Sequence, residues 1–187
     1  MRQFTYGLLL ASVCYGSTAW ADCRNNQDFG TWLNNFKQEA IGAGVSADVV
    51  NKTLNGITLD QSVIQRDRSQ EVFAQTFLEF AGKKVSSFRL SNGQKQIQSN
   101  AKLFQRIEQD YGVPAPMLTA LWALETDFGA VTGDFSTIRS LATLAYDCRR
   151  PERFRPELIS ALLLVQKGDQ TPASMRGAWA GELGQLQ

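Results

Sequence analysis

An acidic residue at the end of an apolar segment is the feature of the sequence that most directly suggests chemistry. Glu125 closes the run 117–124, whose side chains are nearly all apolar. Such a run predicts a buried helix, and burial penalises the ionised form of a carboxyl group. We therefore expect Glu125 to keep its proton near neutral pH and to serve as a general acid. The alternative is an ordinary solvated glutamate at a helix end.

The residues after Glu125 bear on whether it acts alone. Gly129 permits a sharp turn that would leave the Glu125 carboxyl group facing a cleft. Asp127 is the nearest candidate for a second acid, but residues two apart on a helix do not share a face. Asp134 lies further along the chain and stays open as a second acid.

Two other groups of residues have side chains suited to binding. Arg149 and Arg150 are adjacent and can present forked donors to a carboxylate or to polar sugar substituents, although such pairs are usually solvated or salt-bridged. Trp179 precedes Gly181 and Gly184, which let the backbone approach a neighbour closely. A tryptophan there can stack on a sugar face, and the alternative is that it belongs to the core.

The absence of histidine excludes several kinds of catalytic site. The chain contains no histidine and three cysteines. A Ser-His-Asp triad, a Cys-His pair and a histidine-ligated zinc site are therefore impossible, and too few cysteines remain for a thiolate zinc site. The hydrolytic chemistry that is left is mainly carboxylate chemistry, and we expect neither a metal nor another cofactor.

The first 21 residues have the pattern of a cleavable signal peptide. A basic residue, Arg2, precedes an apolar run over 6–15, and the small-x-small triplet 19–21 predicts cleavage before Asp22. The run is too short and interrupted to form a permanent membrane span. The rest of the chain, 22–187, suits a single domain.

Cysteine usage agrees with export. Cleavage would remove Cys14 and leave Cys23 and Cys148, and an even pair in an exported chain predicts a disulfide, with two free buried thiols as the alternative. Lipid attachment at Cys14 is disfavoured because Val13 is bulky where a small residue is needed.

The charges give no sign of a polyanionic partner. The 19 basic and 18 acidic residues are interleaved along the chain. Nucleic-acid-binding proteins usually carry a basic stripe, so we do not expect nucleic acid as a partner.

Apolar residues recur at helical spacing almost everywhere, which predicts an all-α fold. Ser46 is expected to cap a short helix, Asp60 to begin a turn leading into 66–68, and 91–93 to form another turn. No stretch alternates for long enough to demand a strand. The expected helical segments are 29–40, 47–54, 72–81, 97–111, 117–125, 136–145 and 156–166.

Taken in order, several short motifs resemble the lytic transglycosylase B family, whose fold is related to lysozyme. The similarity spans essentially all of the expected mature chain. It is carried by the segments 74–77, 111–114, 124–129, 141–146, 149–150 and 177–181.

The resemblance implies a role for particular residues. Glu125 matches the single catalytic glutamate of the family, and Gln187 matches a glutamine of the cleft. Ala178 departs from the pattern, because a serine often stands there. The residues expected to hold the glycan strand are Arg149, Arg150, Gln187, Trp179, Phe128 and Tyr146.

In the implied reaction, one carboxyl group protonates the glycosidic oxygen between N-acetylmuramic acid and N-acetylglucosamine of peptidoglycan. As a carboxylate it then removes the proton of the muramic 6-hydroxyl group, which closes a 1,6-anhydro ring. No second carboxylate is needed, unlike in most glycosidases. The alternatives are a muramidase that uses water and a module that binds peptidoglycan without cutting it.

The family also implies a location and an expectation about completeness. Peptidoglycan as partner, together with the leader, places the protein in the periplasm without a stable membrane span. In the family much more catalytic domain follows the position of Gln187, in some members with a calcium-binding loop. We therefore expect 22–187 to be the incomplete N-terminal part of a lysozyme-like catalytic domain.

Overall fold

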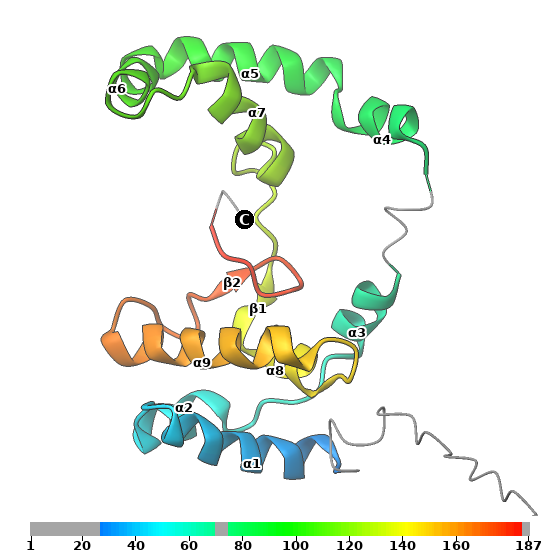
Figure 1. Ribbon diagram of the computed structural model, residues 1–187, viewed down its shortest axis with the longest axis vertical. Coiled ribbons are helices and arrows are strands. Elements are labelled where there is room, and N and C mark those ends of the chain that lie inside the picture. The colour runs from blue at the N-terminus through cyan, green and yellow to red at the C-terminus, as the bar shows by residue number, and fades with distance from the viewer. Residues whose placement is uncertain (1–26, 70–74, 185–187) are drawn as a thin grey trace, which may run out of the picture.

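The protein consists of two groups of helices and a short two-stranded sheet (Figure 1). The computed structural model describes residues 27–69 and 75–184. The first group contains α1 (Phe29–Gly42), α2 (Ala47–Leu54), α3 (Gln61–Arg68), α8 (Thr137–Tyr146) and α9 (Pro151–Lys167). The second contains α4 (Phe77–Lys84), α5 (Ser87–Ser99), α6 (Ala101–Tyr111) and α7 (Ala115–Thr126). The mainly helical fold is confirmed.

The hydrophobic core lies in the first group, around α8. Every residue of α8 except Arg139 is buried, because α1, α3 and α9 all pack against this helix. Apolar side chains at helical spacing on α1, α2 and α9 complete the core. The largest buried members include Phe36, Leu54, Ile138, Leu144, Leu158 and Leu162.

Helix starts follow the local capping signals. The Ser46 hydroxyl group accepts a hydrogen bond from the amide of Val49, at 3.4 Å, as predicted. Asp60 caps α3 by accepting from the amide of Ser62 at 3.0 Å, so this segment forms a helix rather than only a turn. Capping satisfies amide groups that have no partner within the helix.

The predicted turn at 91–93 is wrong. This segment lies inside α5, and Gly93 is buried where α5 crosses α7. A Cβ atom at this position would lie 3.4 Å from the Thr119 methyl group and 3.8 Å from the Phe128 ring. Gly93 thus lies at the contact between two helices rather than in a chain reversal.

Three helix boundaries also differ from prediction. The segment 97–111 is divided at Asn100 between α5 and α6. The last long helix begins at Pro151 and contains Pro156 in its second turn, where proline cannot donate the usual backbone hydrogen bond. The segment 72–81 is only partly described, since 70–74 lie outside the described residues, and α4 begins at Phe77 and ends beyond Gly82.

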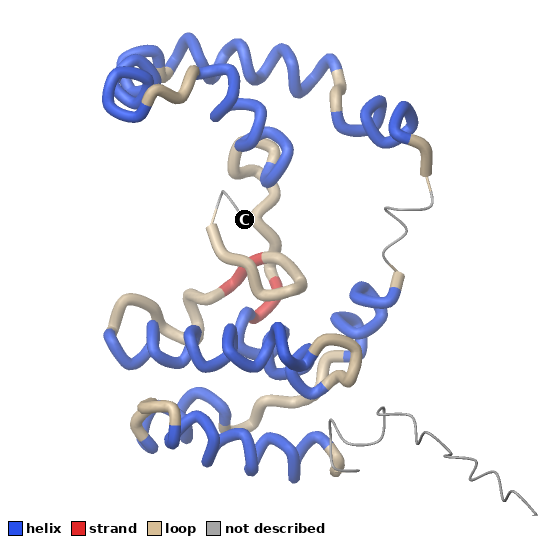
Figure 2. The backbone as a smooth tube through the Cα atoms, in the orientation of Figure 1, coloured by secondary structure: helices blue, strands red, loops and turns tan. Residues whose placement is uncertain are grey.

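The connection from α7 leads into the short sheet (Figure 2). β1 (Phe135–Ser136) pairs antiparallel with β2 (Arg176–Gly177), with Phe135 opposite Gly177. A Cβ atom at Gly177 would lie 1.9 Å from the carbonyl oxygen of Glu182, so the backbone could not pass there with a side chain present. Among the described residues, no helix is long and apolar enough to cross a membrane.

Candidate active site

Glu125 lies in the last turn of α7, and its side chain is exposed. The prediction that Glu125 is buried is therefore wrong. An exposed carboxyl group is open to a ligand, which a buried one would not be. The position of Glu125 at the end of α7 agrees with the sequence pattern.

The prediction that α7 is buried is wrong as well. Only Thr119, Ala123 and Thr126 are buried in this helix, whereas Met117 is 60% exposed and Leu121 is 47% exposed. An apolar helix is buried only where neighbours cover each face, and within the described residues α7 packs mainly against α5 and α6. The apolar composition therefore predicted that this segment is a helix, but it did not predict which faces of the helix are covered.

The backbone after Glu125 adopts an unusual conformation. Asp127, Phe128 and Gly129 have φ angles of 48°, 63° and 84°, all in the left-handed region. Glycine adopts this region freely, but each of the other two residues costs on the order of 1–2 kcal/mol. The turn is closed by hydrogen bonds from the Asp127 amide to the Ala123 carbonyl, at 3.1 Å, and from the Gly129 amide to the Thr126 hydroxyl group, at 3.0 Å.

Asp127 is held by Arg89 of α5. The Arg89 Nε atom lies 2.5 Å from Asp127 Oδ1, and Arg89 Nη1 donates to the Lys84 carbonyl oxygen at 3.0 Å. The hydrogen bond from the guanidinium group lowers the pKa of Asp127. Asp127 is thus a paired anion, which removes it as a second acid. No sequence signal pointed to Arg89.

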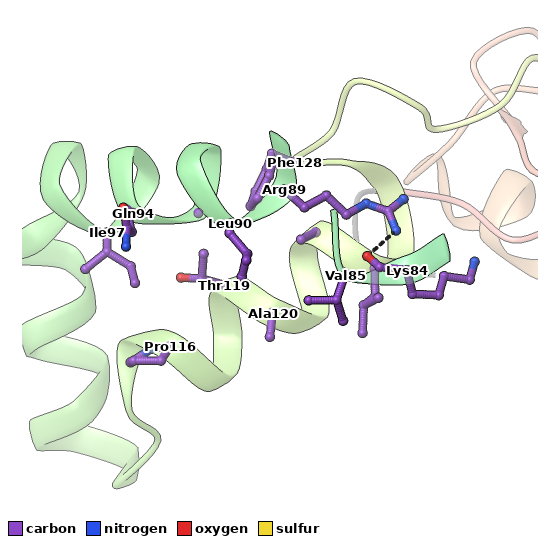
Figure 3. A pocket seen from close by; sticks show the side chains of 13 residues that line it. Lys84, Val85, Arg89, Leu90, Gln94, Ile97, Pro116, Thr119, Ala120 and Phe128 are labelled. Carbon is purple, nitrogen blue, oxygen red and sulfur yellow. Dashed lines mark hydrogen bonds between the residues drawn. The ribbon is translucent and has the colours of Figure 1, made fainter. Parts of the chain in front are cut away.

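A cavity of 270 Å³ lies beside this turn, between α5 and α7 (Figure 3). Its lining is mainly apolar and includes Phe128, whose ring also meets Trp122 edge to face, with centroids 5.5 Å apart. Arg89 and Lys84 lie at one end of the cavity. Glu125 is not among its lining residues, although Leu124 is.

Arg149 and Arg150 are brought together by a buried acid rather than by Glu125. Both form ion pairs with Asp67 of α3, whose side chain is 1% exposed, and the Arg149 contact measures 2.6 Å. Arg149 also donates to the backbone carbonyl of Asp67 at 2.7 Å. Beside them, Arg68 pairs with the buried Asp147 at 2.8 Å. The two arginine side chains keep 43% and 28% of their surface exposed.

Two of the predicted sugar-binding aromatic residues pack in the protein interior. Tyr146 is 8% exposed, its ring meets Phe29 and Trp32, and its hydroxyl group donates to the carbonyl oxygen of Gln27 at 3.0 Å. The buried ring and the paired hydroxyl group give Tyr146 a structural role, and its contact with substrate stays a prediction. Trp179 is partly buried against the core, as in the alternative interpretation.

The two glycines after Trp179 behave differently. At Gly181, with φ of 98°, a Cβ atom would lie 2.7 Å from the Leu141 side chain, which confirms close packing there. At Gly184, with φ of 91°, a Cβ atom would have no described neighbour within 4 Å, so the backbone conformation rather than a steric limit favours glycine there.

The remaining predictions concern a second acid, the glutamine of the cleft, the disulfide and a metal. Asp134 pairs with Arg176 at 2.5 Å, and its side chain is 85% exposed. Gln187 and Cys23 lie outside the described residues, so the Cys23–Cys148 disulfide and the glutamine contact stay predictions. Within the described ranges, no group of three or more acidic or cysteine residues is placed to hold a metal ion.

The mainly helical fold is that of the lysozyme-like lytic transglycosylases, and the chain belongs to the transglycosylase SLT domain family, whose model matches residues 28–187. The chain is 29% identical over 109 residues to membrane-bound lytic murein transglycosylase B of Escherichia coli. It is similar to SltB3 of Pseudomonas aeruginosa, solved in complex with NAG-anhNAM-pentapeptide, at 32% identity and a TM-score of 0.78. It is also similar to soluble lytic transglycosylase SltB1 of the same organism, at 28% identity and a TM-score of 0.73.

The chain spans only part of the length of its relatives. The alignments cover 87% of this chain but 43% of SltB3, 83% of this chain but 53% of SltB1, and 58% of this chain but 30% of the E. coli transglycosylase B. The described structure therefore corresponds to about half of the solved relatives. The family is a family of lytic murein transglycosylases, which are enzymes that act on peptidoglycan.

Proposed function

We propose that the chain is a peptidoglycan lytic transglycosylase, or the part of one that carries the catalytic acid, and that Glu125 acts first as acid and then as base. The observation that carries this proposal is the placement of Glu125. Its exposed carboxyl group stands in the last turn of α7, directly before a turn held in a defined conformation, in a chain of the lytic transglycosylase family.

The proposed reaction needs one carboxyl group and no water. Glu125 gives its proton to the glycosidic oxygen between N-acetylmuramic acid and N-acetylglucosamine, and the bond from that oxygen to the muramic C1 breaks. The resulting carboxylate then takes the proton of the muramic 6-hydroxyl group, whose oxygen bonds to C1. The product is a 1,6-anhydro end, and Glu125 is reprotonated for the next cycle.

Binding of the glycan strand changes the surroundings of the exposed Glu125 carboxyl group. A strand bound over Glu125 would displace water, and a desolvated carboxyl group favours its neutral form. In this scheme Phe128, beside the same turn, contacts the strand. The exposed parts of Arg149 and Arg150 bind polar or anionic substituents further along it.

Location is part of the same proposal. Residues 1–21 are proposed to direct export and to be removed, which places the domain 22–187 in the periplasm, where peptidoglycan lies. A disulfide between Cys23 and Cys148 would suit that compartment.

The experiment is digestion of purified peptidoglycan with the chain and with Glu125→Gln, followed by mass spectrometry of the soluble products. Glu108→Gln, which alters an exposed glutamate of α6, is the matched control. We expect anhydro-muropeptides from the parent chain and from the control but none from Glu125→Gln. Products with reducing ends would identify a muramidase instead. Sacculus binding without any products would identify a binding module, and a fully active, folded Glu125→Gln would overturn the assignment of the acid.

A further inference from the structure

The left-handed turn that follows Glu125 depends on a contact from another helix. Asp127 and Phe128 are not glycine, and neither prefers the φ angles of 48° and 63° that they adopt. Some interaction must therefore hold this conformation. Backbone and side-chain hydrogen bonds within the turn supply part of it, but only the last of the three left-handed residues is a glycine.

The turn is joined to α5 by the ion pair between Asp127 and Arg89. Arg89 is 19% exposed and Asp127 is 30% exposed, so the pair is shielded from most of the solvent. Arg89 is fixed in turn by its bond to the Lys84 carbonyl oxygen at the end of α4, the dashed contact in Figure 3. The guanidinium group thus links α4, α5 and the end of α7.

The other contacts of the turn lie on the same side. The amide of Phe128 donates to the carbonyl oxygen of Trp122 at 3.2 Å, and the Phe128 ring lies near the position where a Gly93 side chain would begin. With these contacts, α7 ends at Thr126. Because Glu125 lies one residue before that end, the direction of its side chain depends on whether the last helical turn stays closed.

We propose that Arg89 is a positioning residue for Glu125: through Asp127 it holds the left-handed turn that closes α7 and so fixes the direction of the Glu125 carboxyl group. This inference rests on the proposed function, because it assumes that Glu125 is the acid. Arg89 itself does not touch the reacting atoms in this scheme. Without the Arg89 side chain, Asp127 leaves the left-handed conformation and the last turn of α7 opens more often. Glu125 then samples orientations that do not reach the glycosidic oxygen.

The test compares three variants. Arg89→Met removes the charge while keeping an extended apolar side chain. Arg89→Met combined with Asp127→Gly replaces the strained aspartate by a residue that adopts positive φ freely, so it restores the turn without the ion pair. Arg176→Met is the matched control, since Arg176 also contacts an aspartate through Nε at 2.5 Å and donates to a backbone carbonyl oxygen, but in the β1–β2 region.

Two readouts are measured on the full chain. The first is amide hydrogen exchange at positions 127 and 128, which we expect to speed up by about tenfold in Arg89→Met and to return toward the parent rate in the double variant. The second is peptidoglycan turnover, for which we expect kcat to fall by about tenfold in Arg89→Met with KM nearly unchanged, and to recover in the double variant. The control variant should leave both readouts unchanged.

The outcomes separate this inference from the proposed function. Unchanged exchange in a folded Arg89→Met variant would overturn the inference even if the chain shows no turnover, and so would a double variant no better than the single one. If Glu125→Gln keeps full activity, the proposed function fails, whereas the exchange result still decides whether Arg89 holds the turn. If Glu125→Gln is inactive and Arg89→Met is fully active, only the positioning role is refuted.

Discussion

Replacing Asp67 by asparagine keeps the shape of the side chain but removes the negative charge that two arginine side chains share. Asp67 is 1% exposed at its side chain, whereas Arg149 is 43% and Arg150 is 28% exposed. Breaking a fully buried pair costs about 3–5 kcal/mol, while an exposed pair contributes less than about 1 kcal/mol. Because both guanidinium groups can still reach water, we expect Asp67→Asn to lower the free energy of unfolding by about 2 kcal/mol.

The assay is urea unfolding followed by far-ultraviolet circular dichroism, with thermal unfolding as a second measurement. A loss of about 2 kcal/mol corresponds to a decrease in Tm of about 4–8 °C for a domain of this size. Glu39→Gln is the matched control, since it removes one charge from the pair between Glu39 and Arg155, whose side chains are 39% and 31% exposed. We expect that change to cost less than about 1 kcal/mol. Equal losses in the two variants would refute the argument that burial of the shared acid sets the magnitude.

The remaining predictions concern packing and pH. Gly93→Ala should leave stability unchanged or raise it by up to about 1 kcal/mol, because alanine favours a helix and its Cβ atom would lie at 3.4 Å from a threonine methyl group, an ordinary contact. Gly181→Ala should lower stability by about 1–3 kcal/mol, since φ is +98° and the Cβ atom would lie 2.7 Å from a leucine side chain of α8. Urea titration checks both, and a stable Gly181→Ala would contradict the packing argument. The hydrogen bond from Arg89 lowers the pKa of Asp127 from its ordinary value of 3.8, so the stabilisation is fully present above that value and is lost as pH falls through the folded-state pKa. The difference in Tm between the parent chain and Asp127→Asn should therefore be constant from pH 7 to 5 and shrink on acidification below about pH 4. A difference that stays the same at pH 3 would contradict this assignment.

Local sequence predicted those features that depend on residues close together in the chain. The helix over 29–40 and the cap at Ser46 were found because apolar spacing and capping involve positions three or four residues apart. The end of the apolar helix near Glu125 was found for the same reason. The Ser-Asn-Gly sequence at 91–93 led to a wrong prediction of a turn. The segment is helical because packing of α5 against α7 at Gly93 outweighs the local turn preference.

Within the candidate site, the sequence by itself determined which residue types were present. The absence of histidine left carboxylate chemistry, and the order of short motifs indicated the family. It placed Glu125 at a helix end.

Only the tertiary structure decided what surrounds these residues, because burial and ion pairs depend on segments far apart in the chain. Glu125 is exposed since no described segment covers the outer face of α7. Arg149 meets Asp67 across 82 positions of sequence, and Asp127 meets Arg89 across 38. No spacing rule reaches over such distances, so the sequence predicted the chemical groups while the fold determined which of them are paired and which are left open to a ligand.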